Sequence, residues 1–166
     1  MQIKTYGTME RFTNNIKEII IMAKFGKKSL ERLETLHPDL KIILYDAIQI
    51  YDFSILDGLR SEEKQNKTFE SGHSTKQYPD SKHNKSKNED ESFNYEISDA
   101  VDIAPYPIKW PELNNQTSKE YTKRMGEFYR LAGIIQAIAD KYNIKIRWGG
   151  DFKWKFDGPH FERVVD

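Results

Sequence analysis

"SLERLETLHPDLKIILYDAIQI", from Ser29 to Ile50, carries the clearest structural signal in this chain of 166 residues. Its apolar residues are Leu30, Leu33, Leu36, Leu40, Ile43, Leu44, Ala47 and Ile48. They recur every three or four positions, the spacing of a stripe buried along one side of a helix. Pro38 stands where proline favours the first turn of a new helix. We therefore predict two helices that separate near His37.

The next segments predict strands and a long loop. "FSILDGLR", starting at Phe53, indicates a short buried strand that ends in a turn at Asp57 and Gly58, which places Arg60 just beyond the strand. Residues 61–97 contain too few large apolar groups for a core of their own, so we expect a long loop region there. "ISDAVDIAPY" then predicts a strand halted by its prolines, with Asp102 at the strand end.

A long helix and two further strands complete the expected fold. Thr117 and Glu120 form a capping-box pattern ahead of a helical stripe. The stripe consists of Phe128, Leu131, Ala132, Ile135, Ile138 and Ala139. "IKIRW" predicts a strand, and a turn-rich segment leads to a last strand at the C-terminus. Helices followed by strands that one long helix interrupts favour a single α+β domain with a small antiparallel sheet.

Composition excludes several classes of function. The 26 basic and 26 acidic side chains cancel, so we expect no nucleic acid as a partner. The chain has no cysteine, and any metal site must therefore use His, Asp and Glu. Its apolar runs are too short for stable membrane insertion and lack a signal-peptide cleavage site. We expect a monomer that stays in the cytoplasm in which it is made.

Residues 1–21 differ from the segment that follows, which begins at Met22 and looks like a complete domain opening. They are either an N-terminal extension, with translation starting naturally at Met22, or a genuine N-terminal helix. We accordingly expect one catalytic domain over 22–166, with a polar insertion at about 84–97.

Four histidines limit the possible metal ligands. A catalytic zinc site without sulfur uses three His or carboxylate ligands and leaves one position for water. His37 lies in "HPD", where a local capping role is expected, whereas His73, His83 and His160 lie in predicted loops or at strand edges. Asp102 at a strand end is suited to aim a carboxylate at a metal. The spacing of these residues alone is equally consistent with surface residues that bind no metal.

Three segments, which occur in this order, favour the metal site over surface residues. They are "SKH" at Ser81–His83, "SDAVDIAPY" at Ser98–Tyr106 and "DGPHFE" at Asp157–Glu162. They resemble the zinc peptidase family of D-alanyl-D-alanine carboxypeptidases and the L-alanyl-D-glutamate peptidases that phages use as endolysins. "FGKKSLERLETLHPDL", "YDFSILDGLR" and "IKIRWGGDF" are similar to the endolysin branch as well. The resemblance covers nearly the whole chain from Phe25 onward.

This resemblance implies roles for five residues. His83, Asp102 and His160 become the zinc ligands, Asp157 the general base, and Arg60 an arginine that binds either the developing oxyanion or a substrate carboxylate. The expected reaction is hydrolysis of the bond between L-Ala and D-Glu in the peptidoglycan stem peptide, with the enzyme released to the wall through a separate membrane pore. Glu162 shares the strand face of His160 and is either a partner that orients this imidazole or a surface carboxylate.

The chain also departs from the family pattern. Residues 84–101 separate the first two ligands, a longer spacing than usual, and Ser98 replaces a customary glycine. Closure entropy grows slowly with loop length, so we keep His83 as the ligand and His73 as its rival.

Two other functions stay open. A D,D-carboxypeptidase shares the zinc chemistry, and a non-catalytic wall-binding domain would keep the metal for stability alone. Trp110 and Trp148 are expected to pack in the core, and Asp151 and Lys153 to lie either in a solvated turn or at the substrate. The acidic insertion at 89–91 is expected to be a solvated loop rather than a lid or a second cation site.

Overall fold

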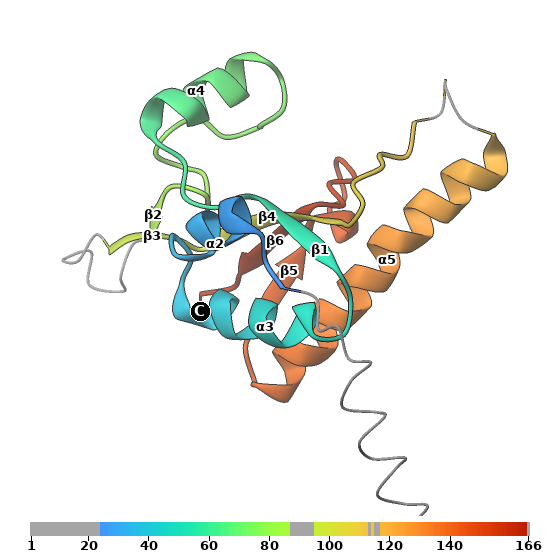
Figure 1. Cartoon of the computed structure of the whole chain (residues 1–166). Helices are drawn as coiled ribbons and strands as arrows, with labels where there is room; N and C mark the ends of the chain where they lie inside the picture. The colour runs from blue at the N-terminus through green and yellow to red at the C-terminus, as the bar shows by residue number, and fades with distance from the viewer. Residues whose placement is uncertain (1–23, 87–94, 113, 115–116, 166) are drawn as a thin grey trace, which may run out of the picture.

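A computed structural model describes residues 24–86, 95–112, 114 and 117–165. The proposed extension at 1–21 and the acidic run at 89–91 lie outside these residues. The elements are α2 (Lys27–Leu33), α3 (Pro38–Ile48), β1 (Phe53–Asp57), α4 (Glu62–Glu70), β2 (Lys85–Ser86), β3 (Tyr95–Ser98), β4 (Ala100–Pro105), α5 (Ser118–Lys141), β5 (Ile146–Trp148), a 3-10 turn η1 (Gly149–Asp151) and β6 (His160–Arg163). Figure 1 shows their arrangement.

The central sheet has four strands in the order β1-β4-β6-β5, and every neighbouring pair is antiparallel. β2 and β3 form a separate two-stranded ribbon. The predicted α+β fold with a small antiparallel sheet, N-terminal helices and one long helix is therefore confirmed.

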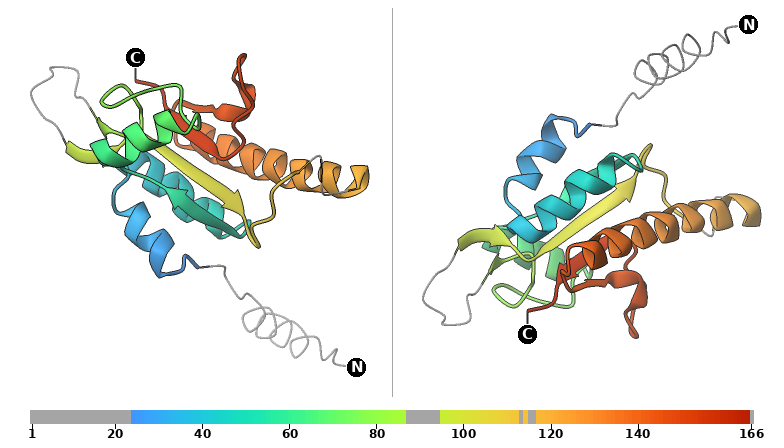
Figure 2. Two further views of the ribbon diagram at one scale, coloured as in Figure 1. Left: turned by 90° about the horizontal axis from the view of Figure 1, so that it is seen from above. Right: turned by 90° about the horizontal axis from the view of Figure 1, so that it is seen from below.

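Helices α3 and α5 pack on each other and cover one face of the central sheet, as the view from below in Figure 2 shows. The apolar stripes predicted for both helices are buried in the core. The opposite face carries α4 and the segment before β6 (Figure 2, left). The helix layer thus encloses the core and leaves the other face of the sheet for polar side chains.

The predicted break between α2 and α3 is confirmed. His37 is the N-cap of α3, where its Nδ1 accepts a hydrogen bond from the Asp39 amide at 3.1 Å, and Pro38 is the first helical residue. The prediction was wrong at Leu30, which is exposed on α2. Its neighbour Ser29 is buried instead, because its Oγ accepts a hydrogen bond from Ile55 of β1.

The long loop expected over 61–97 is also corrected, because it contains α4 and the β2–β3 ribbon. The Ser61 side chain caps the Lys64 amide, and Glu62 and Glu63 lie in the first turn. Gln65 is fully buried although α4 is otherwise polar. A capped helix thus stands where the scarcity of apolar residues predicted none.

The capping box at the start of α5 is confirmed. The Thr117 hydroxyl accepts from the Glu120 amide at 3.2 Å, and the Glu120 carboxylate accepts from the Thr117 amide at 2.9 Å. Among the helices in the described part of the chain, including α5, none is both long enough and apolar enough to cross a membrane.

Strand alternation decides which side chains leave the core. Ile103 of β4 and Phe161 of β6 are buried against the helix layer. Successive residues of a strand point to opposite faces, so Asp102, His160 and Glu162 project from the other face. The chemistry expected from the sequence is thereby gathered on the face that α3 and α5 do not cover.

Asp102 lies inside β4 and not at its end, which corrects the prediction. β4 is a central strand, and Asp102 is opposite Asp57 of β1 on one side and His160 of β6 on the other. A residue with ladder partners on both sides has a more constrained backbone than a residue at a strand end.

Candidate metal centre

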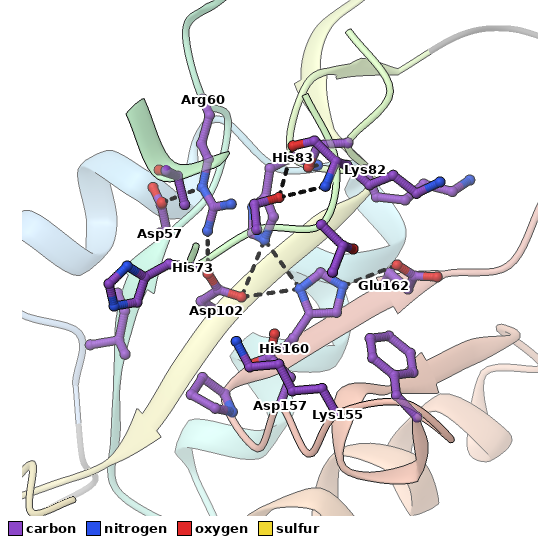
Figure 3. A pocket seen from close by; sticks show the side chains of 18 of the residues that line it. Asp57, Arg60, His73, Lys82, His83, Asp102, Lys155, Asp157, His160 and Glu162 are labelled. Carbon is purple, nitrogen blue, oxygen red and sulfur yellow. Dashed lines mark hydrogen bonds and ion pairs between the residues drawn. The ribbon is translucent and has the colours of Figure 1, made fainter. Parts of the chain in front are cut away.

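Three predicted ligands converge above the central sheet (Figure 3). His83 Nε2 is 3.2 Å from His160 Nδ1 and 3.2 Å from Asp102 Oδ1, and His160 Nδ1 is 3.1 Å from the same oxygen. β4 and β6 supply two of the residues, and the turn before β2 supplies His83. Within the described chain these residues form one group whose ligand atoms all lie close enough to bind one ion.

The outer nitrogen of each imidazole identifies its tautomer. His83 Nδ1 is 2.8 Å from the Gly58 carbonyl oxygen, which can only accept, so this nitrogen donates. His160 Nε2 is 3.0 Å from a carboxylate oxygen of Glu162 and donates to it. In the neutral rings, His83 Nε2 and His160 Nδ1 therefore point lone pairs at the centre of the cluster.

The cluster has a high affinity for positive charge. Burial opposes a charge on His160, but hydrogen bonds to Asp102 and Glu162 outweigh it and raise the pKa of His160 to about 9. Burial also opposes the Asp102 carboxylate, yet the two histidines hold the pKa of this group well below its usual range. Either a proton or a metal ion satisfies three acceptor atoms placed together in this way.

The donor set fits zinc. Two imidazole nitrogens and one carboxylate oxygen are the ligands that zinc uses where no thiolate is present. Ligands about 2.0–2.2 Å from a tetrahedral zinc lie roughly 3.4 Å from each other, close to the separations of 3.1 to 3.2 Å between these atoms.

Arg60 braces the Asp102 carboxylate from the side. Its Nη2 donates to Asp102 Oδ2 at 2.5 Å, its Nε to Asp57 Oδ2 at 2.6 Å, and its Nη1 to the buried Gln65 at 3.4 Å. Lys64 donates to the other Asp57 oxygen at 2.6 Å. One oxygen of Asp102 is thus held by Arg60, and the other faces both histidines.

Glu162 supports His160 from the opposite side. One oxygen of Glu162 accepts from His160 Nε2, while the other accepts from two nitrogens of Arg147. Glu162 is buried, and its hydrogen bonds to His160 and Arg147 outweigh the burial and lower its pKa. Of the two alternatives for Glu162, the geometry selects the partner that orients the imidazole.

Asp157 lines the same cavity but is not part of the ligand group. Its amide donates to the Gly149 carbonyl at 3.0 Å, and its carbonyl accepts from the His160 amide at 3.1 Å. Trp148 Nε1 donates to the Gly158 carbonyl at 2.8 Å and ties the same turn to the core. Burial, and then the charge of Asp102, raise the pKa of Asp157.

A cavity of about 570 Å³ surrounds these groups. Trp110, Phe152 and Trp154 line one part of it, and Phe152 and Trp154 stack with ring centroids 4.9 Å apart. Trp148 is buried as predicted, but Trp110 is 42% exposed and stacks on Phe128, so the core position predicted for it was wrong. The sequence pattern contained no signal for this aromatic lining.

The other candidate residues are not part of the ligand group. The Nδ1 of His73 is 2.9 Å from the Ser71 hydroxyl, and although His73 lines the cavity it is exposed and outside the ligand group. Asp151 and Lys153 are exposed and are not among the residues that line the cavity. His73, the rival to His83, is therefore the less suitable metal ligand of the two histidines.

Comparisons with known proteins identify the family of the chain. The chain is 27% identical over 146 residues to an L-alanyl-D-glutamate peptidase of Escherichia phage T5, covering 85% of this chain and 88% of that protein. Its fold is similar to the crystal structure of the Serratia marcescens L-Ala D-Glu endopeptidase ChiX, with a TM-score of 0.60 and 24% identity over 88% of this chain and 93% of that one. Residues 21–164 match the family described as phage L-alanyl-D-glutamate peptidase. The chain therefore belongs to this family of enzymes.

Proposed function

We propose that this protein is a zinc-dependent peptidoglycan hydrolase that cleaves the bond between L-Ala and D-Glu in the stem peptide. The observation that carries the proposal is the convergence of His83 Nε2, Asp102 Oδ1 and His160 Nδ1 in a cavity that Asp157 also lines. These three residues would hold the metal. Zinc supplies Lewis acidity, which makes water a better nucleophile and a carbonyl a better electrophile.

Asp157 acts as the proton shuttle in this proposal. Its carboxylate takes a proton from the attacking water and later delivers the proton to the leaving amine of D-Glu. The turn that contains it is closed onto Gly149 and onto His160, which limits the positions its carboxylate can reach. A pKa raised by burial suits a group that must both accept and release a proton.

Arg60 was expected to bind the oxyanion or a substrate carboxylate, and this role stays a prediction. Its hydrogen bonds to Asp57 and Asp102 favour a positioning role, in which it fixes the orientation of one ligand. Function as a monomeric lysin that reaches the wall through a separate pore is likewise a proposal, supported by membership of a phage family.

Mass spectrometry of diaminopimelate-type peptidoglycan, after incubation with zinc-loaded protein and with a chelated control, tests the proposal. Peptides that begin at D-Glu and disappear on chelation are expected. Free D-Ala alone would identify a carboxypeptidase, and no product from protein with one zinc per chain would favour a binding domain.

Asp157→Asn separates catalysis from metal binding. We expect this variant to keep one zinc per chain and to lose activity by about 10²- to 10⁴-fold, the usual contribution of a general acid or base. Loss of zinc together with activity would make Asp157 a ligand and contradict the assigned role.

A further inference from the structure

The leaving group of the proposed reaction carries a free carboxylate. In the stem peptide D-Glu continues through its γ-carboxyl group, so its α-carboxylate remains on the carbon bonded to the scissile nitrogen. A group that binds this carboxylate must lie beside the residue that protonates that nitrogen. In this site that residue is Asp157, so the inference rests on the proposed function.

Five cationic side chains line the cavity: Arg60, Lys76, Lys82, Arg147 and Lys155. The two arginines are engaged, Arg60 with Asp57 and Asp102, and Arg147 with Glu162 and with the face of Phe152, 4.9 Å from its centroid. Among the residues that the structure describes, no carboxylate forms an ion pair with any of the three lysines. These lysines are therefore the cations available to a ligand.

Lys155 is the lysine placed beside the proton shuttle. It precedes Asp157 by two residues in the turn that leads to β6, and Figure 3 shows both residues on the same side of His160. Its ammonium interacts electrostatically with the Asp157 carboxylate, whereas Lys76 and Lys82 belong to the segment before β2 that supplies His83. Lys155 is also exposed, so its ammonium is accessible to a substrate.

We propose that Lys155 binds the α-carboxylate of D-Glu on the leaving-group side of the cavity and so selects substrates with a free acid at this position. A substrate in which this group is a carboxamide, as in D-isoglutamine, would lose the charge-assisted hydrogen bond while keeping the same shape and the same scissile bond. The site thus discriminates between two chemical forms of one wall peptide.

The test compares a muramyl tetrapeptide that contains D-Glu with its D-isoglutamine counterpart, by kcat/KM on zinc-loaded protein. We expect the wild type to prefer the acid by about tenfold. Lys155→Met should abolish the preference, because cleavage of the acid should fall more than cleavage of the amide, and Lys155→Arg should restore part of the preference. Lys153→Met is the matched control, because this exposed lysine lies outside the cavity lining and should keep the full preference.

Several results would overturn the inference. If Lys155→Met lost the same fraction of kcat/KM on both peptides, Lys155 would act through Asp157 and not on the carboxylate. If this variant kept the wild-type kcat/KM on both peptides, Lys155 would have no role in binding the substrate. Loss of the preference in Lys76→Met or Lys82→Met instead would assign the role to those lysines. Equal kcat/KM values of the wild type on the two peptides would refute the role of Lys155 but not the proposed function. If the wild type cleaved neither peptide, the proposed function would be refuted, and this inference with it.

Discussion

His160 lies directly opposite Asp102 across the β6–β4 ladder, with its Nδ1 3.1 Å from Asp102 Oδ1. The two residues are 58 positions apart in the sequence, and the strand register brings them together. A slip of one residue in β6 would turn His160 toward the helix layer while Asp102 kept its face, because side chains alternate along a strand. The metal centre is therefore specified by the same pairing that buries Ile103 and Phe161.

Glu162→Gln should weaken zinc binding. The change removes the carboxylate charge that supports the donating nitrogen of His160, and loss of such a partner usually lowers metal affinity by about 10- to 100-fold. Competition with a chromogenic chelator measures the effect directly. Glu31→Gln, an exposed change on α2, is the control and should bind zinc as the wild type does. Equal affinities in the two variants would contradict the orienting role of Glu162.

Arg60→Met should also reduce zinc affinity, because the Asp102 oxygen that faces away from the histidines loses its donor. We expect a loss of about 10- to 100-fold, with Arg60→Lys intermediate since an ammonium cannot reproduce the guanidinium fork. Lys64→Met removes the other cation at Asp57 without touching Asp102 and should leave zinc binding unchanged. If Arg60→Met kept its zinc affinity but lost activity, the arginine would instead act on the substrate.

Gly149→Ala should damage catalysis more than folding. A Cβ at this position would lie 2.4 Å from the Asp157 carbonyl oxygen and 3.0 Å from the His160 Cβ, so the turn carrying both residues must shift. We expect a stability loss of about 1–3 kcal/mol and an activity loss of about 10²-fold. Gly133→Ala on α5 is the matched change, because a Cβ at this position would have no neighbouring atom within 4 Å. It should stabilise the helix by about 0.5–1 kcal/mol. Thermal melts and peptide hydrolysis distinguish the two effects.

The capping box at α5 predicts a pH-dependent contribution to stability. The backbone hydrogen bond from Thr117, and then its hydroxyl, lower the pKa of Glu120 below its ordinary value of 4.5. The folded state therefore binds this proton less readily than the unfolded state, so the contribution is complete above pH 4.5 and is lost as the pH falls through the lower folded pKa.

The difference in melting temperature between the wild type and Glu120→Gln should accordingly be largest at neutral pH. It should shrink as the pH falls and the carboxylate is protonated. Thr117→Ala should cost about 1 kcal/mol at neutral pH, because it removes the hydroxyl cap itself. A difference between the wild type and Glu120→Gln that did not change with pH would rule out a contribution from the Glu120 charge.

Local sequence signals account for much of the fold. Pro38 and the Thr117 capping box specified where two helices begin, and the stripe on α5 matched its buried face residue by residue. The predictions failed where the pattern of apolar residues was the only signal used. Leu30 has the spacing of the buried stripe but lies on the exposed side of α2. Helix α4 has a Ser61 cap, although its residues are mostly polar.

The sequence by itself determined helices α2, α3 and α5, the strand faces and the set of residues capable of chemistry, because propensity, capping and hydrophobic period act over a few residues. It did not determine which of these residues meet. His83 reaches His160 across 77 positions, Arg60 reaches Asp102 across 42, and Gly149 closes onto Asp157. Only the tertiary structure decided these contacts, since strand register and loop closure depend on the packing of the whole domain.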